Sequence, residues 1–169
     1  SKDIASMIRV DHAGEFGATR IYAGQLAVMG DRHPMGRDIA HMAEQEERHL
    51  RFFNEILPKR GVRPTLLQPF WNVAGFALGA VTAAMGPRVA MACTAAVETE
   101  IDRHYQEQLD QLGDSDPELS QAVAEFQAEE LEHREAAIAA GAESAPAYPL
   151  LSLAIRAGCR AAIAVSKRI

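Results

Sequence analysis

The sequence predicts an all-α protein in which a four-helix bundle carries two extra apolar helices. Hydrophobic residues make up 48% of the 169 residues but aromatic residues only 6%, a composition that favours helices over strands. Apolar residues recur three and four positions apart through four long stretches, which is the period of an amphipathic helix. The length suits a single domain, residues 1–169, with a sizeable core.

The four bundle helices are expected at about residues 3–29, 37–57, 88–112 and 117–140. Pro58 is expected to end the second of them, because proline lacks a backbone N–H and clashes with the preceding turn. Gly86 and Pro87 mark the start of the third helix. Asp116 is a suitable N-cap for the fourth, and Pro117 suits its first position.

Two more helices are expected outside the bundle, at about residues 66–86 and 150–168. Residues 56–97 and 144–169 each hold four basic residues and no acidic residue, although the whole chain has a net charge of −6. Arg156, Arg160 and Lys167 are expected to form a basic stripe on the last helix. Helices that are both basic and apolar tend to bind an anionic membrane surface. The alternative for each of these two helices is that it packs against the bundle.

One short motif occurs twice in the bundle pattern. Glu130 and His133 lie three residues apart on the apolar face of their helix, and Glu46 and His49 do the same on the second helix. A carboxylate and an imidazole directed into a core are costly unless something compensates them. Another glutamate precedes each pair by 31 or 32 residues, with a tyrosine seven residues after it. The doubled unit predicts one metal site, formed by Glu15, Glu46, His49, Glu98, Glu130 and His133.

Four carboxylates and two imidazoles are the ligand set of a di-iron or di-manganese site in a helix bundle. Four negative charges around two divalent ions leave such a site formally neutral, which avoids the cost of burying unpaired charge. Ligands without thiolates favour iron or manganese over structural zinc. The alternative, unrelated glutamates and histidines on helix surfaces, is disfavoured by the repeated spacing.

Other polar residues are expected around this site or on the surface. Asp11 and Asp102 lie one turn from the upstream glutamates and are expected to accept hydrogen bonds from the ligand histidines. Tyr22 and Tyr105 are expected to bond the ligand carboxylates, or else to be ordinary core tyrosines. His104 is either a proton or electron relay or an exposed helix residue. The remaining ones are expected on solvated faces: His12, His33, His41, Glu44, Glu47, Glu100, Glu129 and Glu132.

Composition also narrows the partners and the compartment. The acidic balance argues against nucleic acid as a partner. Cys93 and Cys159 give no reason to expect a disulfide, which favours a reducing compartment. No signal or transit sequence is visible at Ser1.

Six segments, some without predicted ligands, resemble one known family. They are Ile8-Arg-Val-Asp-His-Ala-Gly-Glu15-Phe-Gly-Ala, Arg20-Ile-Tyr-Ala-Gly-Gln25, Asn72-Val-Ala-Gly-Phe-Ala-Leu-Gly79, Ala90-Met-Ala-Cys93-Thr, Glu129-Glu-Leu-Glu-His133 and Ala157-Gly-Cys-Arg160. The family is the demethoxyubiquinone hydroxylases of ubiquinone biosynthesis, which have a ferritin-like di-iron bundle. The resemblance runs from about residue 8 to residue 169. The family's iron ligands match all six predicted ligand residues, and a His-Tyr pair implicated in electron delivery matches His104 and Tyr105.

The resemblance implies an O2-dependent monooxygenase that hydroxylates the ring of a polyprenylated demethoxy-quinol. It implies two iron ions and electrons from NADH or from a reductase. It also implies a peripheral membrane protein, on the cytoplasmic face of a bacterial inner membrane or the matrix face of the mitochondrial one. A lipid-binding partner and a homo-oligomer are further expectations. We expect Gly75, Gly79 and nearby alanines to leave room for a substrate channel.

Three other functions use the same ligand set or fold. A ferroxidase or iron-storage protein has the same ligands but does not need two acid-free apolar helices. A di-manganese catalase also has this chemistry. A non-catalytic membrane-associated scaffold with a metal-stabilised bundle is the third, and the complete ligand set disfavours it. Fold alone cannot separate these functions.

Overall fold

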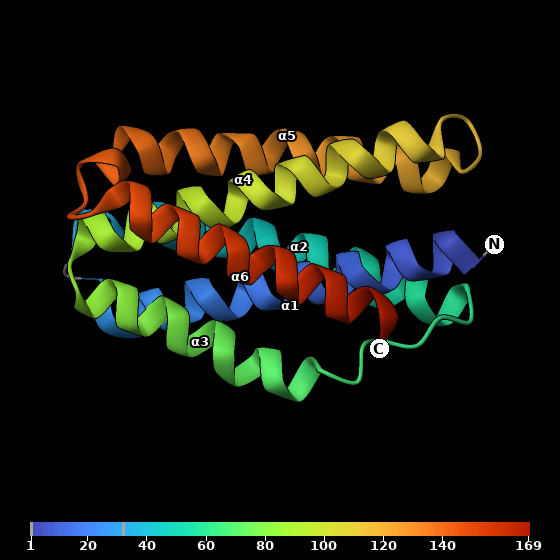
Figure 1. The fold of residues 1–169 in the computed structure, drawn as a ribbon, viewed down its shortest axis with the longest axis horizontal. Coiled ribbons are helices and arrows are strands. Elements are labelled where there is room, and N and C mark those ends of the chain that lie inside the picture. Colours follow the sequence, from blue (N-terminus) through green and yellow to red (C-terminus); the bar gives the residue numbers. More distant parts are fainter. Residues whose placement is uncertain (1, 32) are drawn as a thin grey trace.

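The computed structural model describes residues 2–31 and 33–169, so Ser1, where the predicted domain begins, and Arg32, in the predicted first turn, lie outside the described residues. Within these residues the chain forms helices and no strand, which confirms the all-α prediction. Figure 1 shows their arrangement. The elements are α1 (Lys2–Met29), α2 (Gly36–Lys59), α3 (Gln68–Ala84), α4 (Pro87–Leu112), α5 (Pro117–Ala139), the short 3-10 helix η1 (Ala142–Ser144) and α6 (Tyr148–Arg168).

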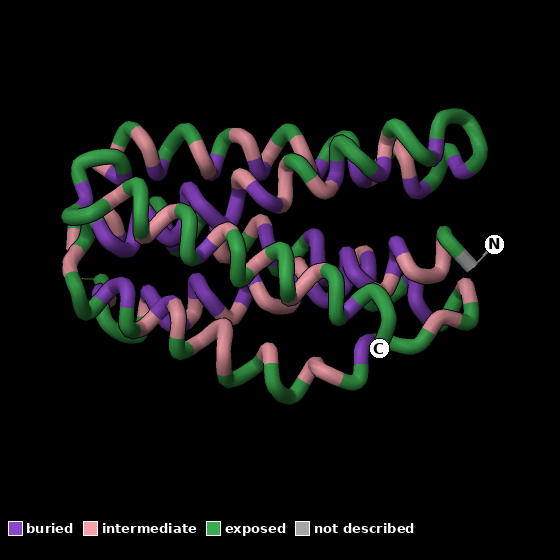
Figure 2. The backbone as a smooth tube through the Cα atoms, viewed as in Figure 1, coloured by how far each residue is buried: buried purple, intermediate pink, exposed green. Residues whose placement is uncertain are grey.

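Helices α1, α2, α4 and α5 form the bundle, and α3 and α6 lie outside it. α3 packs along α1, and α6 packs on α4 and α1. In Figure 1, α5 runs along the top of the view, α3 along the bottom, and α6 crosses between them. Figure 2 shows buried residues along the bundle helices and mainly exposed or intermediate residues along α3 and α6.

The helix ends follow from local chemistry. The Asp116 carboxylate accepts a hydrogen bond from the Leu119 backbone N–H at 3.2 Å, so it caps α5 as predicted. The sequence predicts that the second helix stops at Pro58, and α2 ends one residue beyond it, at Lys59. Proline removes only one helical hydrogen bond there, and the Arg60 N–H still bonds the Ile56 carbonyl at 2.9 Å. Gly61, at φ 63°, then turns the chain away.

Two glycines let α1 and α3 approach closely. A Cβ added at Gly24 would meet the backbone carbonyl of Phe76, and one added at Gly79 would meet that of Ile21. Gly79 therefore serves helix packing, and the expectation that it leaves room for a channel is wrong. Gly75 also packs against α1, but it lines a cavity described below.

Two apolar clusters fill the bundle. One contains Ile8, Phe53 and Tyr105, and the other contains Tyr22 and Met91. Between Ile8 and Tyr22 on α1, the inward positions include buried polar residues. The apolar clusters therefore enclose a belt of buried charge.

α6 is clamped to the bundle by charge. Arg156 Nε and Arg160 Nε donate to the two carboxylate oxygens of Glu100 at 2.8 and 3.0 Å. Glu100 is buried, so its predicted place on a solvated face is wrong: α6 covers it. Arg156 and Arg160 are accordingly not a free basic stripe.

α6 also has the length and composition of a membrane-spanning helix. Among the described residues it is the one helix that meets this criterion, with a mean hydropathy of 1.3, and only 11% of its most apolar window is buried. Length and composition alone are weak support for a span. The exposed apolar side chains lie on α3 as well, which indicates a shared apolar face. On these two helices they are Phe70, Val73, Val81, Leu150, Leu153 and Val165.

Candidate metal centre

The structure brings the six predicted ligand side chains together in the middle of the bundle. They form two overlapping groups, each with one donor atom per residue within 4.8 Å of the others, and all are buried. α1, α2, α4 and α5 each contribute at least one of them. One group is Glu15, Glu46, His49 and Glu130; the other is Glu46, Glu98, Glu130 and His133.

The first group centres on one ring nitrogen of His49. Its Nδ1 lies 3.4 Å from Glu15 Oε2, 3.4 Å from Glu46 Oε2 and 3.1 Å from Glu130 Oε1. The ring stacks on Phe126, with a centroid distance of 4.1 Å. The imidazole is therefore held by packing with Nδ1 facing three carboxylates.

The second group repeats this arrangement around His133. Its Nδ1 lies 3.3 Å from Glu46 Oε1, 3.7 Å from Glu98 Oε1 and 3.2 Å from Glu130 Oε2. Glu46 and Glu130 each present one oxygen to each histidine. These two carboxylates therefore belong to both groups, whereas Glu15 and Glu98 each belong to one.

Each tyrosine of the doubled motif donates a hydrogen bond to the upstream glutamate of the other half. Tyr22 Oη donates to Glu98 Oε1 at 2.7 Å, and Tyr105 Oη donates to Glu15 Oε1. Burial first, and then the neighbouring carboxylates, raises the pKa of both tyrosines well above the ordinary value. They are therefore neutral donors that hold the two outer carboxylates in place.

The outer ring nitrogens of the histidines, Nε2, face Glu129 and Gln45, two residues that were not expected at the site. His49 Nε2 contacts Glu129 Oε2, and Glu129 also accepts from Arg48. His133 Nε2 lies 2.6 Å from Gln45 Oε1. The prediction that Glu129 is simply solvated is wrong. The sequence does relate these two residues to each other: Gln45 and Glu129 are 84 residues apart, which is also the distance between Glu46 and Glu130 in the doubled motif.

Asp11 and Asp102 do not play the part expected of them. Asp11 Oδ1 lies 3.0 Å from His104 Nε2 and accepts from Gln108 at 2.6 Å, while Asp102 Oδ1 accepts from Gln127 at 2.9 Å. Glu129 and Gln45 contact the outer ring nitrogens of the histidines instead. The view of His104 as an exposed residue is also wrong, because Asp11 and α1 cover most of its side chain.

His12 is a second histidine that is not on the surface as expected. It is buried, and its Nε2 lies 2.8 Å from Asn54 Oδ1 on α2. Burial lowers the pKa of His12 although the Asn54 hydrogen bond opposes this. It is a neutral contact between α1 and α2.

Burial and the neighbouring charges shift the pKa values of the glutamates in the cluster in opposite directions. Burial, followed by the charge of Glu46, raises the pKa of Glu15 well above its ordinary value, and burial with the charges of Glu46 and Glu98 does the same for Glu130. Burial also opposes the charge on Glu46, but its polar neighbours Glu15, His133 and His49 outweigh burial and hold the pKa of Glu46 well below its usual range.

The histidines carry the complementary shift. Burial lowers the pKa of His49, but the carboxylates of Glu15 and Glu46 outweigh it and raise the pKa to about 11. The same competition, with Glu46 and Glu98, raises the pKa of His133 to about 9. These raised values show how strongly the cluster attracts positive charge, which protons or metal ions can supply.

The donor set fits a metal. Four buried carboxylate oxygens of the cluster have no hydrogen-bond partner among the described residues: Glu15 Oε2, both oxygens of Glu46, and Glu98 Oε2. Buried polar atoms without partners are rare in proteins and call for a ligand or ion. The buried Glu/His cluster can therefore bind a metal.

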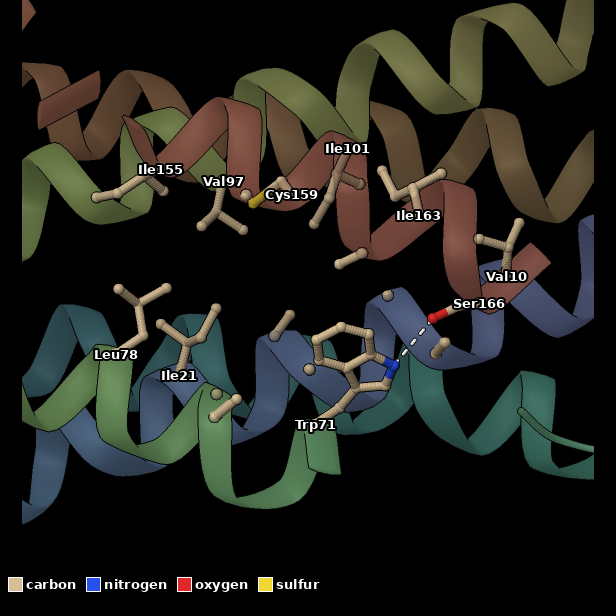
Figure 3. A pocket seen from close by; sticks show the side chains of 18 of the residues that line it. Val10, Ile21, Trp71, Leu78, Val97, Ile101, Ile155, Cys159, Ile163 and Ser166 are labelled. Carbon is tan, nitrogen blue, oxygen red and sulfur yellow. Dashed lines mark hydrogen bonds between the residues drawn. The ribbon is translucent and has the colours of Figure 1, made fainter. Parts of the chain in front are cut away.

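An apolar cavity of about 380 Å³ lies beside this cluster, between α1, α3, α4 and α6. Figure 3 shows side chains from these helices that line it, with the Trp71 indole N–H donating to Ser166 Oγ at 2.9 Å between α3 and α6. Gly14 and Val97 line it, and they are the chain neighbours of Glu15 and Glu98. The cavity therefore reaches the helix turns that carry the two outer carboxylates.

Comparison with known proteins gives consistent results. A family model described as Ubiquinone biosynthesis protein COQ7 matches residues 2–166. A 3-demethoxyubiquinol 3-hydroxylase of Rhodospirillum rubrum is 53% identical over 166 residues, covering 98% of this chain and 78% of that protein. An NADPH-dependent 3-demethoxyubiquinone 3-hydroxylase, mitochondrial, of Mus musculus is 54% identical, covering 96% of this chain and 76% of that protein. A 5-demethoxyubiquinone hydroxylase, mitochondrial, of Saccharomyces cerevisiae is 41% identical, covering 96% and 77%.

Proposed function

The chain belongs to the COQ7 family of ubiquinone biosynthesis proteins, and from this we propose that it hydroxylates the ring of a demethoxyubiquinol at a di-iron centre. The observation that carries the proposal is the pair of overlapping four-residue groups with unpaired carboxylate oxygens. Relatives that share about half of their residues with this chain are named as hydroxylases of this kind. The family favours this function over a ferroxidase, a manganese catalase or a scaffold.

Six residues would hold the two metal ions. His49 and Glu15 would serve one ion, His133 and Glu98 the other, and Glu46 and Glu130 both, since their oxygens lie in both groups. Four carboxylates would balance two divalent ions, which removes the need for the protons that the cluster otherwise retains. When bound, two iron ions supply the activation of O2, so that one oxygen atom enters the ring and the other leaves as water.

The balance of the reaction requires electrons and protons. One O2, two electrons and two protons convert a ring C–H into C–OH and one water. We assign the electrons to NADH, NADPH or a reductase; the mouse relative is named as NADPH-dependent. His104 and Tyr105 are adjacent in sequence, and Tyr105 donates to Glu15 while His104 contacts Asp11. This pair is our candidate for passing electrons or protons to the centre.

The substrate would use the apolar cavity. Its lining is almost entirely aliphatic, and the exceptions are Trp71, Ser166 and Cys159. Such a lining would suit a prenylated ring and would exclude water from it. Burial raises the pKa of the Cys159 thiol to about 12, so this side chain presents a neutral thiol to the cavity. The ring would enter beside Gly14 and Val97, next to the outer carboxylates, with the tail between α3 and α6.

The exposed apolar face of α3 and α6 would rest on the membrane that holds the prenyl tail. Phe70, Val73, Leu150 and Leu153 are each at least 60% exposed, and such side chains insert into an interface. We assign the chain to the cytoplasmic face of a bacterial inner membrane or the matrix face of the mitochondrial one. A lipid-binding protein or a second copy of the chain would be a further binding partner for this face.

Isotope labelling tests the proposed reaction. The iron-loaded protein is given a short-chain demethoxyubiquinol, a nicotinamide reductant and ¹⁸O2. The expected product gains one ¹⁸O atom on its ring, measured by mass spectrometry. Oxidation of added Fe(II) without any ring product, in the presence of a competent reductase, would contradict hydroxylation and favour the ferroxidase.

A further inference from the structure

The two halves of the doubled motif place different side chains against the outer nitrogens of the two histidines. Gln45 and Glu129 stand one residue before Glu46 and Glu130. Each reaches across to the histidine of the other half: Glu129 contacts His49 Nε2, and Gln45 Oε1 lies 2.6 Å from His133 Nε2. The positions are equivalent, but one acceptor is a carboxylate and the other a neutral amide.

A second difference reinforces the first. The Glu129 carboxylate also accepts from Arg48 Nη2, and the position equivalent to Arg48 in the second half is Glu132. The Arg48 guanidinium holds Glu129 from one side while His49 holds it from the other. Glu129 is thus fixed against the imidazole although part of it reaches the surface.

A carboxylate and an amide have different effects on an imidazole. An ionised carboxylate can only accept hydrogen bonds, so it fixes the proton of His49 on Nε2 and leaves Nδ1 free to bind a metal. It also makes the ring a better electron donor. The Gln45 amide has a carbonyl and an NH2 group, so it can pair with either tautomer of His133 and adds no negative charge.

We propose that Glu129 makes the two metal positions unequal, so that the ion served by His49 and Glu15 binds more tightly and first. This inference rests on the proposed function, because it assumes an ion at each position. Glu129 is a positioning residue, since it acts through His49 and does not itself join either four-residue group. The pseudo-symmetric ligands thus form a centre with two electronically different ions.

Anaerobic titration with ⁵⁷Fe(II), followed by Mössbauer spectroscopy, tests the inequality. In the unmodified protein we expect two quadrupole doublets that fill one after the other. Glu129→Gln places an amide on both sides, so the doublets should converge and the affinity for the first ion should fall about tenfold or more. Gln45→Glu places a carboxylate on both sides, so the doublets should also converge while the affinity for the second ion rises.

Glu132→Gln is the matched control. It makes the same change of charge on the same helix, three residues from Glu129, and should leave both doublets and the order of filling unchanged. If Glu129→Gln fails to fold, Gln45→Glu alone decides.

Two results would overturn the inference. One is a single doublet, filled in one step, in the unmodified protein. The other is a pair of doublets that neither Glu129→Gln nor Gln45→Glu moves. Two equivalent irons would overturn only this inference, whereas an unmodified protein that binds no iron would overturn the proposed function as well.

Discussion

The bundle interior and the face formed by α3 and α6 invert the usual distribution of side chains in a protein. The interior holds four glutamates and two histidines that are almost completely buried, whereas the outer face exposes aromatic and aliphatic residues such as Phe70 and Leu150. Each arrangement is costly in water, because buried charge and exposed apolar surface both need a partner. The buried cluster can bind a metal, and on the proposed function the outer face contacts lipid or the prenyl tail, so the two regions would serve different ligands.

Removing a carboxylate that belongs to both four-residue groups should have the largest effect, and this effect should be confined to the bundle interior. Glu130 belongs to both four-residue groups, so Glu130→Ala should reduce iron content and hydroxylation to background while vesicle binding is retained. Iron analysis, product analysis and vesicle sedimentation of one preparation measure all three. Glu132→Ala, on the same helix, is the control that should keep all of them. Full hydroxylation by Glu130→Ala would show that the cluster is not the active site.

Filling the cavity should separate substrate binding from metal binding. Apart from its chain neighbours and the backbone of α6, a Cβ added at Gly158 would meet no described atom within 4 Å, and Gly158 lines the cavity. Gly158→Leu should therefore occupy the space and raise KM for the quinol about tenfold or more. Iron content should not change. Steady-state kinetics compare it with Gly158→Ala, which adds one methyl group and should act weakly; equal effects of the two would contradict a substrate site there.

Polar substitutions on the outer face should weaken membrane attachment. Leu150 and Leu153 are 69% and 64% exposed, and replacing both by serine should lower affinity for anionic vesicles about tenfold or more. Hydroxylation of a short-chain, water-soluble quinol should be unaffected. Ala124→Ser with Ala128→Ser, at exposed positions on the bundle helix α5, is the control. Unchanged vesicle binding by the leucine variant would exclude this part of α6 from the membrane contact.

The clamp between α6 and the bundle should give the smallest effect. Burial raises the pKa of Glu100, but the hydrogen bonds from Arg160 and Arg156 outweigh burial and hold this pKa below its usual range. A lowered acid pKa stabilises the folded state above the unfolded pKa, and this stabilisation is lost as pH falls through the folded pKa. In metal-free protein, Glu100→Gln should cost about 1–2 kcal/mol at pH 7, because both arginines are partly exposed.

Denaturant unfolding at several pH values measures this cost. The difference between Glu100→Gln and the unmodified protein should shrink as the pH falls below the ordinary glutamate pKa of about 4.3 and through the lowered pKa of Glu100. A difference that is the same at pH 7 and at pH 3 would show that the clamp acts through packing and not through charge.

Sequence alone predicted the helices and the six clustered residues because both depend on spacing along one chain. Glu130 and His133 share a helix face whatever surrounds them, and the second copy of the motif made a chance pattern improbable. The partners of the histidines could not be read in this way. Glu129 and Gln45 point off the apolar face of their helices, and they reach the histidines only because α2 and α5 lie next to each other.

Two other errors have the same origin. Glu100 reads as a surface residue until α6 covers it, and that contact joins segments more than 50 residues apart. Gly79 reads as a small residue that leaves space, but α1 fills that space with its backbone. Local patterns thus predicted what each helix presents, and the packing between helices decided what each side chain contacts.

Crystals of the iron-loaded protein, measured at the iron absorption edge, test the central claim most directly. The account predicts two anomalous peaks, one beside His49 Nδ1 and Glu15 and the other beside His133 Nδ1 and Glu98, both flanked by Glu46 and Glu130. Iron bound elsewhere, with no peak in this cluster, would contradict the assignment of the buried charge to a metal centre.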